Sequence, residues 1–345
     1  MAKLLLSTYE LKTGMMLGET VLNNYGAVIV SEGTILDEYI IRKLGNLELP
    51  KIKVICEENN IPLRETSDAF NMQYSKNMDS IRNIICDLEA GKGIDVGKIN
   101  RVAESVILKA SERKDIVRCL NQIKLSGEYL YTHSINVSLL SMLLGKWLGY
   151  KETEIKKLVI AGLLHDVGKT RVSSKILNKP GKLTEEEYNE IKKHAVYGYR
   201  ILENEKNMDK DVSHAVLMHH EREDGSGYPM GIKGEKISKL AKVIAVADIY
   251  DAMTSNRVYK ERESAFEVFR MMERESIGKL DIKVVNALLS NIASYFVGDF
   301  AKLNDGRVCE IVYINPRFVS SPIINIDGGY IDLSEDTDLI IEEIL

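Results

Sequence analysis

The fold and the chemistry of this chain centre on one stretch of sequence, Leu163-Leu164-His165-Asp166-Val167-Gly168-Lys169. The apolar run at residues 158–164 predicts a buried helix that leads into the His165–Asp166 pair. Burying an unpaired carboxylate costs several kcal/mol, so an aspartate held there normally meets a partner charge or a metal ion. Taken alone, the pair fits an ordinary hydrogen-bonded aspartate as well as it fits a metal site.

The distribution of the other histidines favours the metal site. All six histidines of the chain fall between residues 133 and 220, each on or at the end of a predicted helix. A second carboxylate, Asp248, lies in the most apolar helix of the sequence, predicted over residues 237–254, and Asp251 follows one turn later. Imidazole and carboxylate are common ligands of divalent transition metals. We therefore expect Asp248 to bind a metal rather than to make only a structural hydrogen bond.

Seven side chains form the predicted ligand set, and none of them offers sulfur: His133, His165, Asp166, His194, His219, His220 and Asp248. One metal takes roughly four to six ligands, and some positions must stay open for water and substrate. Seven protein ligands therefore fit two divalent metals that share Asp166 better than they fit one. Such metal pairs are used for displacement at phosphorus, and the nitrogen and oxygen donors favour iron or manganese.

Composition and charge exclude several classes of protein. The net charge of −5 argues against binding to a nucleic-acid polymer, which needs basic stripes. The four cysteines form no CxxC pair, which argues against a zinc knuckle and a disulfide framework. No run approaches about 18 apolar residues, and the N-terminal apolar run is too short for a signal peptide. We therefore expect a cytoplasmic protein without a membrane span.

The predicted fold is mainly α-helical, with a smaller α/β region formed by the N-terminal and C-terminal segments. We expect a small β/α region at residues 1–62, a helical connecting platform at 63–126, a catalytic helical domain at 127–294 and a β-rich tail at 295–345. About fifty residues are few for an independent β unit. The tail is therefore expected to pack on the N-terminal region.

Two local signals mark where elements begin or turn. Thr184 and Glu187 have the spacing of a capping box, in which each side chain bonds the backbone amide of the other residue at the start of a helix. Residues 304–306, Asn-Asp-Gly, predict the turn of a hairpin in the tail. Both signals depend on neighbouring residues alone.

Several separated motifs, in this order, resemble the HD-GYP family. The resemblance covers about residues 128–272 and rests on His165-Asp166 with Gly168-Lys169, His194 with Gly198, His219-His220-Glu221-Arg222, Asp224-Gly225-Ser226-Gly227-Tyr228-Pro229, and Ala247-Asp248-Ile249-Tyr250-Asp251-Ala252-Met253-Thr254-Ser255 with Arg257 and Tyr259. That family is a branch of the HD-domain metal-dependent phosphohydrolases. The resemblance implies an all-helical catalytic core that hydrolyses cyclic dinucleotides, chiefly the bacterial second messenger cyclic di-GMP, to pGpG or GMP.

The resemblance also implies how the metals are held. One metal would be bound by His133, His165, Asp166 and Asp248, and Asp166 would bridge to a second metal bound by His194, His219 and His220. Some members bind a third metal through a glutamate four residues before the first histidine. Tyr129 occupies that position here, which favours two metals, and His214 matches no ligand position.

The remaining matches imply roles in catalysis and substrate binding. Lys169 matches the family's lysine beside the metals and is expected to act in catalysis with Asp166. Arg257 and Lys260 match positions that contact substrate phosphate, for which their charges are suited. In the loop at residues 225–229, glycines such as Gly227 are expected to let backbone approach the site, while Tyr228 fixes the loop.

The resulting hypothesis is metal-dependent hydrolysis of the phosphodiester bonds of a cyclic dinucleotide by a water that two metals activate. One alternative is an HD-type nucleotidase that acts on another nucleotide. A second alternative is a sensor that binds a cyclic dinucleotide without cleaving it, although the full ligand set argues against this. The flanking regions are where a homodimer or a signalling partner would bind.

Overall fold

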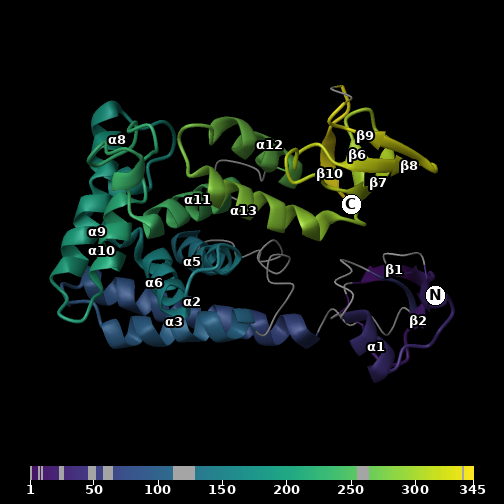
Figure 1. Cartoon of the computed structure of the whole chain (residues 1–345). Helices are drawn as coiled ribbons and strands as arrows, with labels where there is room; N and C mark the ends of the chain where they lie inside the picture. Colours follow the sequence, from purple (N-terminus) through teal and green to yellow (C-terminus); the bar gives the residue numbers. More distant parts are fainter. Residues whose placement is uncertain are drawn as a thin grey trace. The chain divides into compact units, whose positions relative to one another are not determined.

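The computed structural model describes residues 2–6, 8, 11–22, 27–45, 52–56, 65–111, 129–254, 264–335 and 338–345. The chain divides into two compact units, one comprising residues 1–71 with 290–345 and the other residues 72–289. Helices dominate the described residues, which confirms the predicted mainly α-helical class (Figure 1). In the described part of the chain, no helix is both long and apolar enough to cross a membrane.

The N-terminal segment forms a small sheet with one helix. Strands β1 (Ala2–Leu6), β5 (Ile52–Cys56) and β2 (Met16–Leu17) make an antiparallel sheet in the order β1-β5-β2. Strand β3 (Val21–Leu22) pairs with β4 (Val28–Val30), and helix α1 spans Glu38–Gly45. Its buried core includes Leu17, Leu36, Leu44, Ile52 and Val54.

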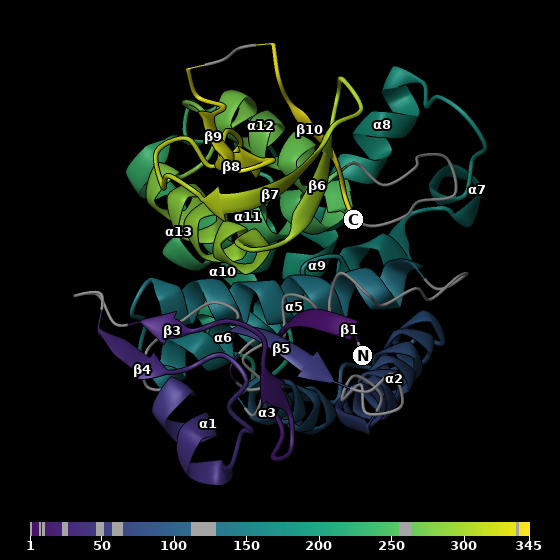
Figure 2. The same cartoon turned by 90° about the vertical axis from the view of Figure 1, so that its right-hand side faces the viewer.

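The C-terminal segment forms a five-stranded antiparallel sheet in the order β10-β6-β7-β8-β9 (Figure 2). The strands are β6 (Phe300–Leu303), β7 (Val308–Tyr313), β8 (Ile323–Ile326), β9 (Gly329–Asp332) and β10 (Ile341–Ile344). The predicted hairpin joins β6 to β7, and Gly306 takes a positive φ of 88° in its turn. The packing of this tail on the N-terminal segment stays a prediction.

Two long helices open the helical unit. Helix α2 spans Glu65–Glu89 and α3 spans Val96–Ser111, with Gly91 at a φ of +82° in the turn between them. Their apolar residues recur every three or four positions, and Ile81, Leu88 and Ile99 are buried. The helical character predicted for the connecting platform is therefore found in its described residues.

Three helices that are apolar around most of their circumference make the core of this unit: α5 (Tyr129–Trp147), α6 (Glu152–Leu164) and α11 (Lys239–Thr254). Helices α5 and α6 pack very closely at Gly162, where a Cβ atom would lie 2.6 Å from Ser138 Cα. Only glycine permits this approach. The crossing brings the C-terminal end of α6 against the face of α5 that carries His133.

Shorter helices surround this core: η2 (Val167–Arg171), α7 (Ser174–Leu177), α8 (Glu185–Lys192), α9 (His194–Glu203), α10 (Lys210–Met218), η3 (Gly234–Lys236), α12 (Ala265–Glu275), α13 (Ile282–Ala293) and η4 (Ser294–Phe296). The predicted capping box begins α8: Thr184 N donates to Glu187 at 2.8 Å, and Glu187 N donates to Thr184 Oγ1 at 3.3 Å. Gly168 in η2 contacts the start of α9, where a Cβ atom would lie 1.9 Å from His194 O.

Candidate metal centre

The seven predicted ligands come together from five separate segments. His133 lies on α5, and His165 and Asp166 lie between α6 and η2. His194 begins α9, His219 and His220 follow α10, and Asp248 lies on α11. Two groups of three have ligand atoms within 4.8 Å of one another: His133, His165 and Asp166, and His194, His219 and His220.

The His165–Asp166 pair lies just beyond α6 rather than within a helix. Helix α6 ends at Leu164, His165 is its C-cap, and Asp166 leaves the helical conformation with φ −97° and ψ 4° before η2 begins. The Asp166 side chain is 4% exposed and accepts from Lys169 Nζ at 2.5 Å. Burial opposes ionisation of this carboxylate, but Lys169 and His165 outweigh it and hold the pKa of Asp166 well below its usual range.

Backbone carbonyls orient the imidazole rings. In three of the histidines Nδ1 bonds the carbonyl three residues earlier: His165 to Gly162 at 2.9 Å, His194 to Ile191 at 2.6 Å, and His219 to Val216 at 2.7 Å. A carbonyl only accepts, so each Nδ1 carries the proton and each Nε2 presents a lone pair. This is the tautomer that a metal-binding histidine needs.

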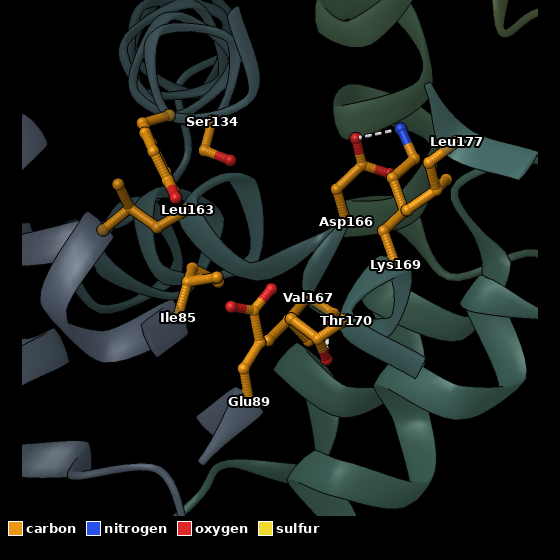
Figure 3. Close-up of a pocket in the computed structure, with 10 residues that line it drawn as sticks. Ile85, Glu89, Ser134, Leu163, Asp166, Val167, Lys169, Thr170 and Leu177 are labelled. Carbon is orange, nitrogen blue, oxygen red and sulfur yellow. Dashed lines mark hydrogen bonds and ion pairs between the residues drawn. The ribbon is translucent and has the colours of Figure 1, made fainter. Parts of the chain in front are cut away.

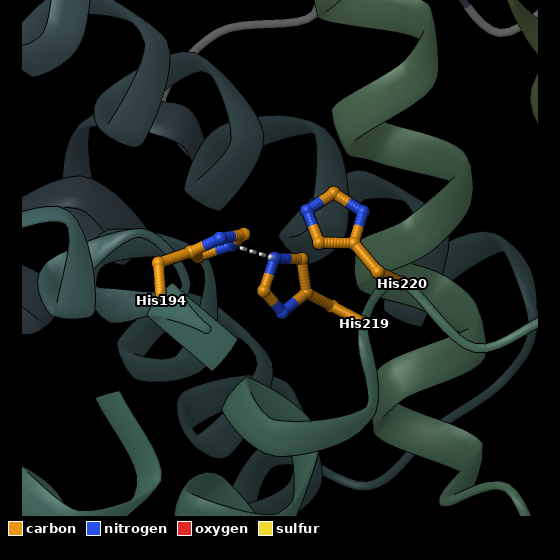
Figure 4. Close-up of side chains that lie close together, drawn as sticks. All are labelled: His194, His219 and His220. Atoms are coloured by element: carbon orange, nitrogen blue, oxygen red, sulfur yellow. Dashed lines mark hydrogen bonds between the residues drawn. The ribbon is translucent and has the colours of Figure 1, made fainter. Parts of the chain in front are cut away.

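The free Nε2 atoms face one another in pairs. His133 Nε2 lies 3.2 Å from His165 Nε2, and His194 Nε2 lies 3.3 Å from His219 Nε2 (Figure 4). Facing lone pairs repel unless a proton or another cation lies between them. The buried imidazole and carboxylate donors therefore fit divalent cations, and both groups can hold one.

The two groups differ in the charge that they favour. Burial lowers the pKa of His133, but hydrogen bonds to Asp248 and Asp251 outweigh it and raise that pKa to about 10. In the second group burial dominates: it lowers the pKa of His219 well below its usual value and that of His220 to about 3. The first group thus attracts a positive charge, and the second offers neutral nitrogens.

One carboxylate, Asp166, faces both ligand groups, and a second, Asp248, faces the first group. Asp166 Oδ2 lies 3.4 Å from His165 Nε2, while its Oδ1 lies 3.4 Å from His194 Nε2. Asp248 Oδ1 lies 3.1 Å from His133 Nε2, and its side chain is 15% exposed. Asp166 therefore faces both groups, which is the position that a bridging ligand requires.

Behind His133 lies a hydrogen-bonded chain that sequence analysis did not identify. His133 Nδ1 contacts Asp251 Oδ2 at 2.7 Å, and Asn136 Nδ2 donates to Asp251 Oδ1 at 2.8 Å. Tyr74 of α2 donates from its hydroxyl to Asn136 Oδ1 at 2.8 Å. The only signal in the sequence was the three-residue spacing of Asn136 from His133 and of Asp251 from Asp248.

The Gly-Tyr-Pro loop is held against the second ligand group. The ring of Tyr228 stacks on His220 with centroids 4.6 Å apart, and the Tyr228–Pro229 peptide bond is cis. Gly227 packs on the backbone just before it, where a Cβ atom would lie 2.5 Å from Arg222 N. The lack of a side chain at Gly227 thus permits this close contact within the loop, and the expected approach of its backbone to the site stays a prediction. Glu221, which the sequence motif contains without a predicted role, is buried and accepts from Met230 N at 2.7 Å.

One histidine singled out in the sequence lies apart from this site, and other such residues fall outside the described part of the chain. Arg257 and Lys260 lie outside the described residues, and only the backbone of Tyr129 is described. His214 lies away from the ligands, stacked on Tyr199 with centroids 5.9 Å apart. His214 is also the histidine that matches no ligand position in the sequence.

A pocket opens beside Asp166 and Lys169 (Figure 3). Its walls come from α2, α5 and the segment from the end of α6 to α7. They are formed by Ile85, Glu89, Tyr131, Ser134, Leu163, Asp166, Val167, Lys169, Thr170 and Leu177. A molecule in this pocket would touch the carboxylate that faces both ligand groups.

Comparison with known proteins agrees with this architecture. Residues 118–284 match a family model described as HD domain. The solved structure of Bd1817, a HDG"Y"P protein from Bdellovibrio bacteriovorus, aligns with a TM-score of 0.55 and 17% identity over 83% of this chain and 98% of that chain. The helical fold thus resembles that of HD-domain proteins.

Curated relatives narrow the assignment. The cyclic di-GMP phosphodiesterase PA4108 of Pseudomonas aeruginosa is 35% identical over 70% of this chain and 58% of its own length. A cyclic di-GMP phosphodiesterase of Thermotoga maritima is 33% identical over 72% of this chain and 64% of its own length. The 3'3'-cGAMP-specific phosphodiesterase 1 of Vibrio cholerae is 36% identical over 51% of this chain and 41% of its own length. The chain spans less than two thirds of each of these relatives. These similarities support an HD-GYP family assignment.

Proposed function

We propose that this protein hydrolyses a phosphodiester bond of a cyclic dinucleotide in a metal-dependent reaction. Cyclic di-GMP is the first substrate to test, because relatives that match most of this chain are named for it. The observation that carries the proposal is the position of Asp166, which faces both groups of histidines and contacts Lys169.

In this proposal two divalent metals, iron or manganese, occupy the two ligand groups. One metal would be held by His133, His165 and Asp248. The other would be held by His194, His219 and His220, and Asp166 would contact both metals. Bound metals would supply the Lewis acidity that activates water and polarises the phosphoryl oxygens. The neutral imidazoles of the second group and the ionised carboxylates are ready to bind metal at neutral pH, whereas His133 would release a proton when a metal binds.

The residues around the ligands would position the substrate. Lys169 is partly exposed at the pocket and carries the positive charge that can face a phosphoryl oxygen. Tyr228 and Gly227 hold their loop against His220 and so shape the entrance beside the second ligand group. Arg257 and Lys260 are proposed to contact substrate phosphate, and Arg257→Ala is expected to raise KM.

The wider organisation is proposed on the same basis. Residues 127–294 would form the catalytic domain, joined by the platform at 63–126 to the flanking regions at 1–62 and 295–345. Those flanking regions would bind a signalling partner or a second copy of the chain in the cytoplasm. Sedimentation of the full chain tests whether two copies associate.

The decisive experiment is to purify the protein without oxygen, measure its metal content and identify the product from cyclic di-GMP. Release of pGpG or GMP in proportion to bound metal is expected. Asp166→Ala should remove turnover and metal together, because it deletes the carboxylate shared by both groups. Normal hydrolysis by a folded Asp166→Ala variant would contradict the proposal. Tight binding without any product would instead support the non-hydrolysing sensor.

A further inference from the structure

The pocket beside the proposed catalytic residues has two chemically different ends. Lys169 lies at one end, next to Asp166. At the other end, helix α2 contributes the carboxylate of Glu89, which Figure 3 shows beside Ile85 and Val167. A ligand that fills the pocket therefore meets a cation at one end and an anion at the other.

Glu89 occupies an electrostatically unfavourable position. It is the last residue of α2, where the helix dipole disfavours a negative charge, and the last turn of α2 contains no basic residue. Its neighbour Asp87 is paired with Lys92 at 2.7 Å and Lys98 at 3.3 Å. Among the described side chains, by contrast, no cation forms an ion pair with Glu89. Within this described part of the chain, its oxygens are therefore open to a ligand.

The middle of the pocket is apolar. Ile85, Leu163 and Val167 line it with buried side chains. A flat, weakly hydrated ring gains free energy by leaving water for such a surface. The sequence of cation, apolar wall and carboxylate matches a nucleotide, which carries a phosphate, a ring and a polar ring edge in that order.

A carboxylate at the polar edge discriminates between the purines. An ionised carboxylate only accepts hydrogen bonds. Guanine offers two donors side by side, N1–H and the N2 amino group, whereas adenine offers its N6 amino group beside the acceptor N1. A carboxylate facing adenine would therefore oppose one lone pair with another.

We propose that this pocket receives one base of the substrate and that Glu89 selects guanine by accepting hydrogen bonds from N1–H and N2–H. This inference deepens the proposed function and rests on it for the identity of the substrate as a cyclic dinucleotide. It assigns Glu89 a role in specificity rather than in the chemical step. Both cyclic di-GMP and 3'3'-cGAMP contain the guanine that this pocket would take.

The test is Glu89→Gln, which keeps the shape of the side chain but replaces one acceptor by a donor. We would measure kcat/KM for cyclic di-GMP and for cyclic di-AMP. The ratio of the two should fall about tenfold or more, because losing a hydrogen bond to a charged group has effects of that order. Glu203→Gln, at the last residue of α9 and outside the pocket, is the matched control and should leave the ratio unchanged.

A binding measurement separates this inference from the proposed function. Calorimetry with the metal-loaded protein should show tighter binding of cyclic di-GMP than of cyclic di-AMP, and Glu89→Gln should abolish that preference. If this binding preference is found but no dinucleotide is hydrolysed, the result would support guanine selection and contradict the proposed hydrolysis. Turnover with a ratio unchanged in Glu89→Gln, an equal loss for both dinucleotides, or no guanine preference in the wild type would overturn the inference.

Discussion

His133 Nδ1 lies 2.7 Å from Asp251 Oδ2, and this contact joins a proposed metal ligand on α5 to a buried carboxylate on α11. Asp251 is the more buried of the two aspartates on its helix, with 5% of its side chain exposed against 15% for Asp248. Because Asp251 receives the Nδ1 proton, His133 turns its Nε2 towards Asp248 and His165. Asp251 thus orients the ring of His133, whereas Asp248 lies among the proposed ligands.

Asp251→Asn is expected to weaken metal binding at the first group. The amide oxygen can still accept from His133, but it lacks the negative charge, and such partners typically change metal affinity about 10–100-fold. Titration of metal-free protein with manganese would measure this. The group formed by His194, His219 and His220 should keep its affinity and serves as the internal control. An unchanged titration curve would show that Asp251 does not tune His133.

Tyr74→Phe tests the outer end of the same chain. It removes the hydroxyl that donates to Asn136 at 2.8 Å in a buried setting, so the free energy of unfolding should fall by about 0.5–1.5 kcal/mol. Denaturant unfolding measures the loss. Tyr199→Phe removes a hydroxyl bonded to exposed Glu203 and should change stability by less than about 0.5 kcal/mol. Equal effects of the two variants would contradict a stabilising role for this buried chain of hydrogen bonds.

Lys169→Met should separate catalysis from metal binding. Without its charge near the phosphoryl group, kcat is expected to fall about 10²–10³-fold while metal content stays normal. Metal analysis and turnover on the same sample measure both quantities. Lys175→Met, an exposed lysine on α7, is the matched control and should alter neither. Loss of metal in Lys169→Met would instead assign this lysine to the integrity of the site.

Gly168→Ala should destabilise the helical unit. The new Cβ would lie 1.9 Å from His194 O, so η2 and α9 must separate, and overpacking of this kind costs at least about 2 kcal/mol. Because His194 begins α9, the second ligand group should also lose metal affinity. Unfolding experiments with and without metal measure both effects. Gly45→Ala, where a Cβ atom meets nothing within 4 Å, should be nearly neutral.

The second ligand group should make metal-free protein sensitive to acid. His220 has a folded-state pKa of about 3, whereas an unfolded histidine titrates near 6.5. Between these values the unfolded chain binds a proton that the folded chain does not, so the free energy of unfolding falls as pH decreases from about 6.5. Unfolding of chelator-treated protein at about pH 7.5 and about pH 5 measures the slope. His220→Asn should reduce it, and exposed His214→Asn should not.

Local patterns in the sequence were enough to predict the helices and turns. The Thr184–Glu187 capping box and the hairpin at residues 304–306 form where they were expected, because each depends on residues within a few positions. The types of the seven candidate ligands were also evident, since histidines and a carboxylate in apolar helices are rare without a partner. The sequence by itself therefore determined the helical class and the chemical character of the site.

Only the tertiary structure decided how those residues meet. Asp251 and His133 are 118 positions apart, and Tyr74 and Asn136 are 62 apart, so no periodicity could pair them. The closeness of Gly168 to His194 O likewise follows from the packing of two helices. Contacts across such separations depend on how whole helices cross. The orientation of each imidazole and the pocket between Glu89 and Lys169 were therefore beyond any local pattern.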